Sequence, residues 1–261
     1  MNTSSLLIEK DGPFATLLTL NRPEKRNALS MDLMKELCGA IEDAGRDKTR
    51  RVIVIKGAGD AFCAGLDLKE ASDSKNATVS ARMVARMLLT VSQTPLITIA
   101  AVHGAAVAGG AGLMSACDFV VAASGTKIGY PEVRRGLVAA LVMTFLRRHL
   151  RERDIRELLL TGELITAERA LAMGLVNRVA APSEVMQEAR KLAASVVQGG
   201  PLAVTRTKQI LDGSWPNSVK QDLQRALKHH LKARHSAEAE EGITAFLEKR
   251  HPRWVSPLPS D

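Results

Sequence analysis

The chain has 261 residues, a hydrophobic content of 46% and a formal net charge of +8, from 36 basic and 28 acidic residues. This length allows one large core, or one core with a small appendage. Aromatic residues make up only 3% of the chain, which leaves no stacking platform and argues against nucleic-acid binding. The positive charge suits a small phosphorylated or otherwise anionic ligand, or serves solubility alone.

Cysteines, histidines and apolar runs give no sign of secretion, metal binding or membrane insertion. The three cysteines lack metal-ligand spacing and the first residues lack the layout of a signal peptide, so we expect a cytoplasmic protein. His229, His230 and His235 have no acids at ligand spacing, so we expect no metal. The nearly uncharged stretch Leu96–Met114 could be a membrane span, but glycines and His103 interrupt it, so we expect no membrane segment.

In chain order, the first predicted elements are a strand, a helix and a second strand. Phe14–Leu20 is typical of a strand, which the turn at Asn21-Arg22-Pro23 ends. Ser30 is placed to cap a helix whose apolar residues at positions 34, 37, 38 and 41 fall on one face. Val52–Ile55 is short, apolar and β-branched, which indicates a buried strand.

The segment Ala61–Glu70 follows as a first strand–turn–helix junction. Ala64 and Gly65 lie at its bend, and Asp67 and Glu70 have the spacing of a capping box. Residues 72–78 are polar and predict a mobile segment. Apolar residues at positions 83, 84, 87, 88 and 91 then predict an amphipathic helix.

A second junction lies between residues 96 and 118. Leu96–Val102 predicts a buried strand, Gly104 breaks it, and glycines at 109, 110 and 112 open a segment that can start a helix. This geometry points free backbone N–H groups at a ligand, whose acceptor could be a phosphate, a carboxylate or a thioester oxygen. A dinucleotide-binding fingerprint does not fit, because the glycine spacing is wrong and Asp118 comes too soon.

After this junction strands alternate with helices up to about residue 180, and helices alone follow. The expected elements are a strand at Phe119–Ala122, a helix at Arg153–Leu160 and a strand at Val176–Val179. Thr166 would cap a short helix ending near Gly174, and Pro201 would begin one of the later helices. This order predicts an α/β core over residues 1–195 and a helical C-terminal domain over residues 196–261.

The two junctions have the forms F-x-A-G-x-D-L and A-V-x-G-x-A-x-x-G-G, and they resemble those of the crotonase family, the enoyl-CoA hydratases and isomerases. The resemblance runs from Leu20 to Trp254 and includes Pro131-Glu132. It implies an α/β fold of the ClpP/crotonase-like type, a spiral of ββα units with a C-terminal all-helical trimerisation domain. It further implies a homotrimer or a hexamer of two trimers, an acyl-CoA thioester as substrate, and no cofactor beyond the substrate's own coenzyme A.

The resemblance also implies how the thioester would be held. Its oxygen would accept hydrogen bonds from the backbone N–H groups of Ala64 and Gly109. Removing the α-proton of a thioester produces an enolate, and one preorganised donor to its oxygen is worth roughly 3–4 kcal/mol. The resemblance assigns further residues to substrate or coenzyme A binding: Arg26, Ala28, Gly65, Asp67, Lys69, Gly110, Phe246 and Lys249. Taken by themselves, Asp67 is more typical of a helix cap and Phe246 of a core or interface residue.

The positions of acidic residues distinguish between the reactions that the resemblance allows. Family members with paired acids carry one glutamate where this chain has Gly112 and another where it has Glu132, and the acid of dienoyl-CoA isomerases would align near Ala140. Hydration is helped by two positioned groups, whereas moving a double bond from the 3,4 to the 2,3 position needs one base. The resemblance therefore favours enoyl-CoA isomerisation with Glu132 as the proton shuttle, its pKa raised by a partly apolar pocket.

Other readings of the same residues stay open. Glu132 could be a surface carboxylate that pairs with Arg134 or Arg135. The protein could be an enoyl-CoA hydratase whose second acid is another group or a water, or a non-catalytic acyl-CoA-binding protein. Cys63, beside the first bend, fits a small buried apolar role better than that of a nucleophile, because no histidine is visibly paired with it.

Overall fold

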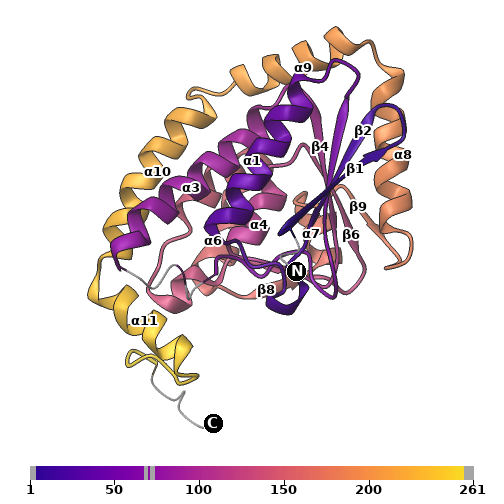
Figure 1. The fold of residues 1–261 in the computed structure, drawn as a ribbon. Coiled ribbons are helices and arrows are strands. Elements are labelled where there is room, and N and C mark those ends of the chain that lie inside the picture. The colour runs from indigo at the N-terminus through magenta and orange to yellow at the C-terminus, as the bar shows by residue number, and fades with distance from the viewer. Residues whose placement is uncertain (1–3, 68–69, 71–73, 256–261) are drawn as a thin grey trace.

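The computed structural model describes residues 4–67, 70 and 74–255 and gives them an α/β fold (Figure 1). Its main sheet consists, in spatial order, of β1 (Leu6–Asp11), β2 (Ala15–Leu20), β3 (Val52–Gly57), β4 (Ile97–Val102), β6 (Phe119–Ala123) and β9 (Arg178–Ala180). β1 runs antiparallel to β2, and each later neighbour runs parallel. The predicted fold class is confirmed.

A smaller sheet joins β5 (Ala105–Val107), β7 (Lys127–Gly129) and β8 (Leu164–Thr166). Isolated bridges pair Leu29 with Leu66 and Cys63 with Ala106, so the first junction lies beside this sheet. The chain twice leaves the main sheet, adds a strand to the small sheet and then enters a helix: β4–β5–α4 (Gly109–Ser115), and β6–β7 followed by the 3₁₀ helix η2 (Pro131–Arg135). These are the ββα units that the resemblance implied.

Helices cover both faces of the main sheet (Figure 1). The helices α1 (Met31–Arg46), α3 (Ser74–Gln93) and α4 lie on one face, and α8 (Val185–Gln198) lies on the other. Strand β3 shows why the strands are continuously apolar: Ile53 and Ile55 pack in the core under the first group, and Val52 and Val54 pack under α8. A parallel sheet with two covered faces needs apolar residues at consecutive positions.

The later helices place the C-terminal part of the chain against the site described below. They are α5 (Ala140–His149), α6 (Glu152–Thr161), α7 (Ala167–Met173), α9 (Pro201–Gly213), α10 (Val219–Arg234) and α11 (Ala237–Leu247). α10 packs on α3 and α5, and α11 packs on η2. A Cβ on Gly136 would lie 2.3 Å from the carbonyl oxygen of Glu238, so α11 rests directly on the segment after η2.

Several predicted elements are confirmed, and the structure also contains elements that were not predicted. The hydroxyls of Ser30 and Thr166 cap α1 and α7 as expected, and the segments after residue 183 are helical in the described part of the chain. The strand β1, the small sheet and α5 were not predicted. The division at residues 195 and 196 stays a prediction, and α8 spans both of those residues.

The polar segment and the capping box of the first junction need correction. Residues 74–78 belong to α3, while residues 72 and 73 lie outside the described residues. The N–H of Asp67 donates to the carbonyl oxygen of Leu29 at 3.0 Å. Glu70 instead accepts a hydrogen bond at 3.0 Å from the N–H of Met31, at the start of α1. No capping box forms, because a neighbouring segment supplies the partners of both residues.

Candidate active site

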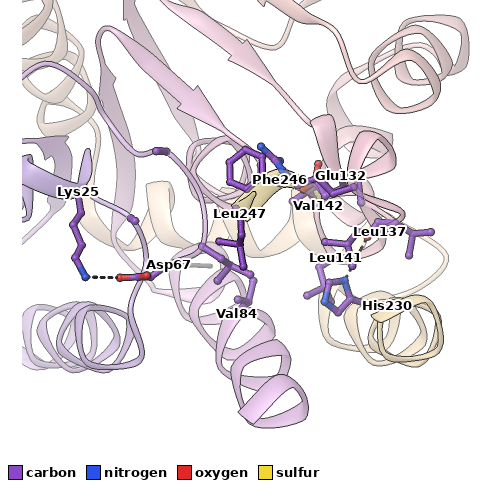
Figure 2. Close-up of a pocket in the computed structure, with 18 residues that line it drawn as sticks. Lys25, Asp67, Val84, Glu132, Leu137, Leu141, Val142, His230, Phe246 and Leu247 are labelled. Carbon is purple, nitrogen blue, oxygen red and sulfur yellow. Dashed lines mark hydrogen bonds and ion pairs between the residues drawn. The ribbon is translucent and has the colours of Figure 1, made fainter. Parts of the chain in front are cut away.

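A cavity of about 430 Å³ lies between the two junctions, η2 and the C-terminal helices. Six of the predicted site residues line it: Ala28, Ala64, Asp67, Gly109, Glu132 and Phe246. Its walls are mainly apolar, with side chains from α3, α5, α11 and the segment that follows η2: Val84, Leu137, Val138, Leu141, Val142 and Leu247 (Figure 2). The cavity therefore combines an apolar interior with a few polar groups, as small-molecule sites do.

Four other predicted residues, which the structure describes, do not line the cavity: Arg26, Gly65, Gly110 and Lys249. Gly65 has a φ of +101°, and a Cβ there would lie 3.6 Å from the Gly109 nitrogen, so it permits the close approach of the two bends. A Cβ on Gly110 would lie 2.3 Å from the carbonyl oxygen of Cys63, so Gly110 packs the junctions together. Arg26 and Lys249 are exposed and are not among the lining residues, and Lys69 lies outside the described residues.

The structure contradicts the assignment of Ala64 as a hydrogen-bond donor to the ligand. Its backbone N–H already donates to the carbonyl oxygen of Arg26, at 3.0 Å. Sequence alone could not show this, because the partner belongs to the loop after the first predicted strand. An N–H engaged within the protein is not free for a thioester oxygen.

The N–H of Leu66, two residues after Ala64, is free where that of Ala64 is engaged. Leu29 is hydrogen-bonded to the residues on either side, accepting from Asp67 and donating to Gly65, so the N–H of Leu66 points away from Leu29. Among the described residues, neither the Leu66 nor the Gly109 N–H has a partner. A Cβ placed on Gly109 would lie 3.8 Å from the Leu66 nitrogen, so the two free donors are close neighbours on the cavity wall.

Glu132 is the acid at the apolar part of this cavity (Figure 2). It follows Pro131 in the first turn of η2, where a proline loses no hydrogen bond. Its Oε2 atom is shielded from solvent and has no hydrogen-bond partner in the described part of the chain. Burial raises the pKa of Glu132 to about 7, with Arg135 opposing the shift. A carboxyl with such a pKa can both take and return a proton near neutrality.

Position 112, where the resemblance places the other glutamate of paired-acid family members, has no room for that side chain. A Cβ on Gly112 would lie 2.5 Å from Cγ1 of Val142, so a glutamate at that position would displace the cavity wall. Asp67 also lines the cavity, but it accepts hydrogen bonds from Arg22 at 2.9 Å and Lys25 at 3.2 Å. Although burial opposes it, these two cations hold the pKa of Asp67 below its ordinary value. Figure 2 shows Asp67 well separated from Glu132.

The cavity also includes polar side chains that the sequence did not suggest. Lys25 lines it where Arg26 was expected. Arg135 lines it with its guanidinium 4.2 Å from the ring centroid of Phe246. His230 reaches it from α10, with Nδ1 3.4 Å from the carbonyl oxygen of Val138, and burial lowers the pKa of His230, which keeps the ring neutral. No local pattern brings these residues together, because α10 and α11 reach the site only through tertiary packing.

The metal, cysteine and membrane alternatives can be compared with the described residues. Within the described ranges, no group of three or more His, Cys, Asp or Glu side chains is placed to hold a metal ion. Cys63 is fully buried, and burial raises the pKa of its thiol to about 12, so it is not an activated nucleophile. Of the helices in the described part of the chain, none is long and apolar enough to cross a membrane.

Comparison with known proteins gives one consistent result. The family model described as enoyl-CoA hydratase/isomerase matches residues 15–257. A Thermus thermophilus relative with a provisional enoyl-CoA hydratase name is 38% identical over 95% of this chain and 100% of its own length. Crotonyl-CoA hydratase of Syntrophomonas wolfei is 33% identical over 98% and 100%. The crystal structure of carnitinyl-CoA hydratase from Mycobacterium avium, 33% identical, superposes with a TM-score of 0.85 over 97% of this chain and 99% of that one.

Proposed function

The chain belongs to the enoyl-CoA hydratase/isomerase family and is an acyl-CoA enzyme, and we propose that it isomerises a 3-enoyl-CoA to the 2-enoyl-CoA with one base, Glu132. The N–H groups of Leu66 and Gly109 would hold the thioester oxygen. The family has enzymatic members, so we set aside the alternative of a non-catalytic acyl-CoA-binding protein.

In the proposed reaction, the Glu132 carboxylate takes a proton from the α-carbon, and the C–H electrons form a dienolate. The charge on the thioester oxygen is stabilised by the two backbone donors, each worth roughly 3–4 kcal/mol in sites of this kind. The resulting carboxylic acid returns the proton to the γ-carbon, and the double bond then lies between the α- and β-carbons. Atoms and charge balance with no second acid and no water.

The observation that carries this proposal is the combination of one half-buried acid on the cavity wall and a lack of space for an acid at residue 112. Glu132 faces an apolar cavity, and the side chain of Val142 occupies the space that an acid at residue 112 would need. Such an arrangement supports proton transfer between two carbons more directly than the simultaneous activation of water and delivery of a proton.

The test follows the ultraviolet absorbance of the conjugated thioester. With a 3-enoyl-CoA such as 3-hexenoyl-CoA, we expect this absorbance to rise, and we expect Glu132→Gln to lower kcat by about 10²-fold or more. Glu163→Gln, a change of the same type at an exposed position, is the matched control. Turnover by Glu132→Gln at the wild-type rate would exclude Glu132 as the base.

Hydration is the second candidate, and the names of the relatives favour it, since crotonyl-CoA hydratase and short-chain-enoyl-CoA hydratase match nearly the full chain. A water, or His230 on the cavity wall, would then supply the second group. Hydration removes the conjugated absorbance of a 2-enoyl-CoA such as crotonyl-CoA. A specific activity with crotonyl-CoA that exceeds the activity with 3-hexenoyl-CoA would favour this reaction over isomerisation.

We also propose where coenzyme A lies. Lys25 lines the cavity and Arg26 is the exposed cation next to it, while Lys249 follows the cavity-lining end of α11 closely. These cations suit the phosphates of the coenzyme. The inhibition constant for free coenzyme A should rise with salt concentration, because exposed charge pairs are screened. A constant that does not change with salt would count against a charge-assisted phosphate site.

The exposed apolar side chains of α9 support a homo-oligomer, as the resemblance implied. Leu202, Ile210 and Leu211 are 70%, 69% and 64% exposed. Apolar surface concentrated on one helix is typical of a protein interface. We expect a trimer or hexamer by light scattering, and expect Ile210→Glu to dissociate it. Leu171→Glu, at an exposed apolar position on α7, should not do so. A monomeric wild-type protein would contradict this proposal.

The cysteines support a reducing compartment. In the described part of the chain, Cys38, Cys63 and Cys117 are all buried and unpaired. Unpaired cysteines are typical of proteins of reducing compartments, so we propose a cytoplasmic location.

A further inference from the structure

Arg135 stands out among the half-buried arginines of the described residues. Arg22 and Arg148 bind carboxylates, and Arg51 donates to a backbone carbonyl. Arg135 forms neither a hydrogen bond nor an ion pair with any described residue. Its Nε atom is shielded from solvent and has no partner. A shielded guanidinium N–H without a hydrogen-bond acceptor is costly, and such a cost is usually offset by a ligand or a counter-ion.

The described residues around Arg135 supply no hydrogen-bond acceptor for its guanidinium. Its guanidinium lies over the Phe246 ring, which holds it on the cavity wall. The neighbouring wall is apolar, and Glu132 affects Arg135 through space without pairing with it. Of the other nitrogen-bearing side chains that line the cavity, Lys25 pairs with Asp67, and burial lowers the pKa of His230. A purely hydrocarbon acyl chain would therefore leave Arg135 without any acceptor.

We propose that Arg135 recognises a carboxylate at the end of the acyl group, so that the substrate is the thioester of a short dicarboxylic acid. A guanidinium presents its donors in a fork that matches two carboxylate oxygens. The cation would also offset the repulsion between Glu132 and an anionic acyl group. This inference rests on the proposed binding of an acyl-CoA in the cavity, and it adds the chemistry of the acyl end.

The test compares two saturated thioesters of equal chain length, glutaryl-CoA and pentanoyl-CoA, by calorimetric titration. Neither can be isomerised, so the result does not depend on the proposed reaction; turnover by Glu132→Gln tests that reaction separately. We expect the wild-type protein to bind glutaryl-CoA at least about 10-fold more tightly, the effect of a hydrogen bond to a charged group. Arg135→Leu should abolish that preference.

The matched control is Arg134→Leu, which removes the same charge from the adjacent, exposed arginine and should keep the preference. Arg135→Lys keeps the charge without the fork and should give an intermediate preference; it also serves if Arg135→Leu does not fold. Equal or tighter binding of pentanoyl-CoA by the wild-type protein overturns the proposal. A preference that survives in Arg135→Leu overturns it as well.

Discussion

Replacing Glu132 by glutamine should remove activity and raise stability at the same time. In the folded protein, burial raises the pKa of Glu132 from an ordinary value of 4.5 to about 7. Between these two values the folded state keeps a proton that the unfolded state has lost. The free energy of unfolding therefore falls as the pH rises through this range. Above pH 7 the loss that Glu132 causes is complete, and the free energy falls no further on its account.

The size of this loss follows from the shift. One pKa unit corresponds to about 1.4 kcal/mol, so the shift of Glu132 costs the folded state about 3 kcal/mol once the group is ionised in both states. Glutamine has nearly the same shape and never ionises. The stability gained by Glu132→Gln should therefore increase by about 2 kcal/mol between about pH 5.5 and about pH 8.5. For a chain of this size, that is a change of roughly 4–8 °C in the difference between the two Tm values.

The assay is thermal or denaturant unfolding of the wild type and Glu132→Gln at both pH values, at one protein concentration. Glu163→Gln is the control, because it removes the same charge from a side chain that is 71% exposed. A stability difference for Glu132→Gln that is the same at both pH values would refute the reasoning, since it would mean that Glu132 ionises as freely in the folded chain as in the unfolded one.

Three further outcomes follow from the site. The kcat/KM for a 3-enoyl-CoA should rise with pH and level off above pH 7, because the base form of Glu132 is the active one; a pH-independent rate from pH 5 to 9 would contradict this. Gly136→Ala should lower Tm and raise KM, because its Cβ would meet a carbonyl oxygen of α11, whereas Gly125→Ala, also at positive φ but with open space, should lower Tm only slightly and leave KM unchanged. Asp67→Asn should destabilise the fold by about 3 kcal/mol in denaturant unfolding, because it leaves Arg22 half-buried without its carboxylate; an unchanged midpoint would mean that the pair contributes nothing.

The sequence predicts those parts of the fold that local chemistry specifies. The glycines of the second junction and the capping hydroxyls of Ser30 and Thr166 act over a few residues, and all are found as expected. β1 was not predictable, because of its six residues only Leu6 is buried, which leaves no alternation to detect. The strands β5, β7 and β8 are three residues long each, too short to show a period.

The error at Ala64 has a single physical cause. Gly65, between Ala64 and Leu66, has a φ of +101°, so the backbone turns there, and the N–H of Ala64 points to the loop with Arg26 while the N–H of Leu66 points away from Leu29. Whether the N–H of Ala64 or that of Leu66 is free depends on pairing with Arg26 and Leu29, far away in the chain. The same holds for Arg135, whose contact with Phe246 exists only because α11 returns to η2.

Both free donors of the cavity wall belong to the main chain, at Leu66 and Gly109. Mutation can change the side chain at residue 66 without deleting its N–H, since every amino acid except proline carries that group. Leu66 also lines the cavity, so a change of its side chain can alter the space available to different acyl groups. The backbone N–H that would bind the thioester oxygen is retained in such a variant. A library of variants at this one position is therefore a rational starting point for redirecting the enzyme toward new thioesters.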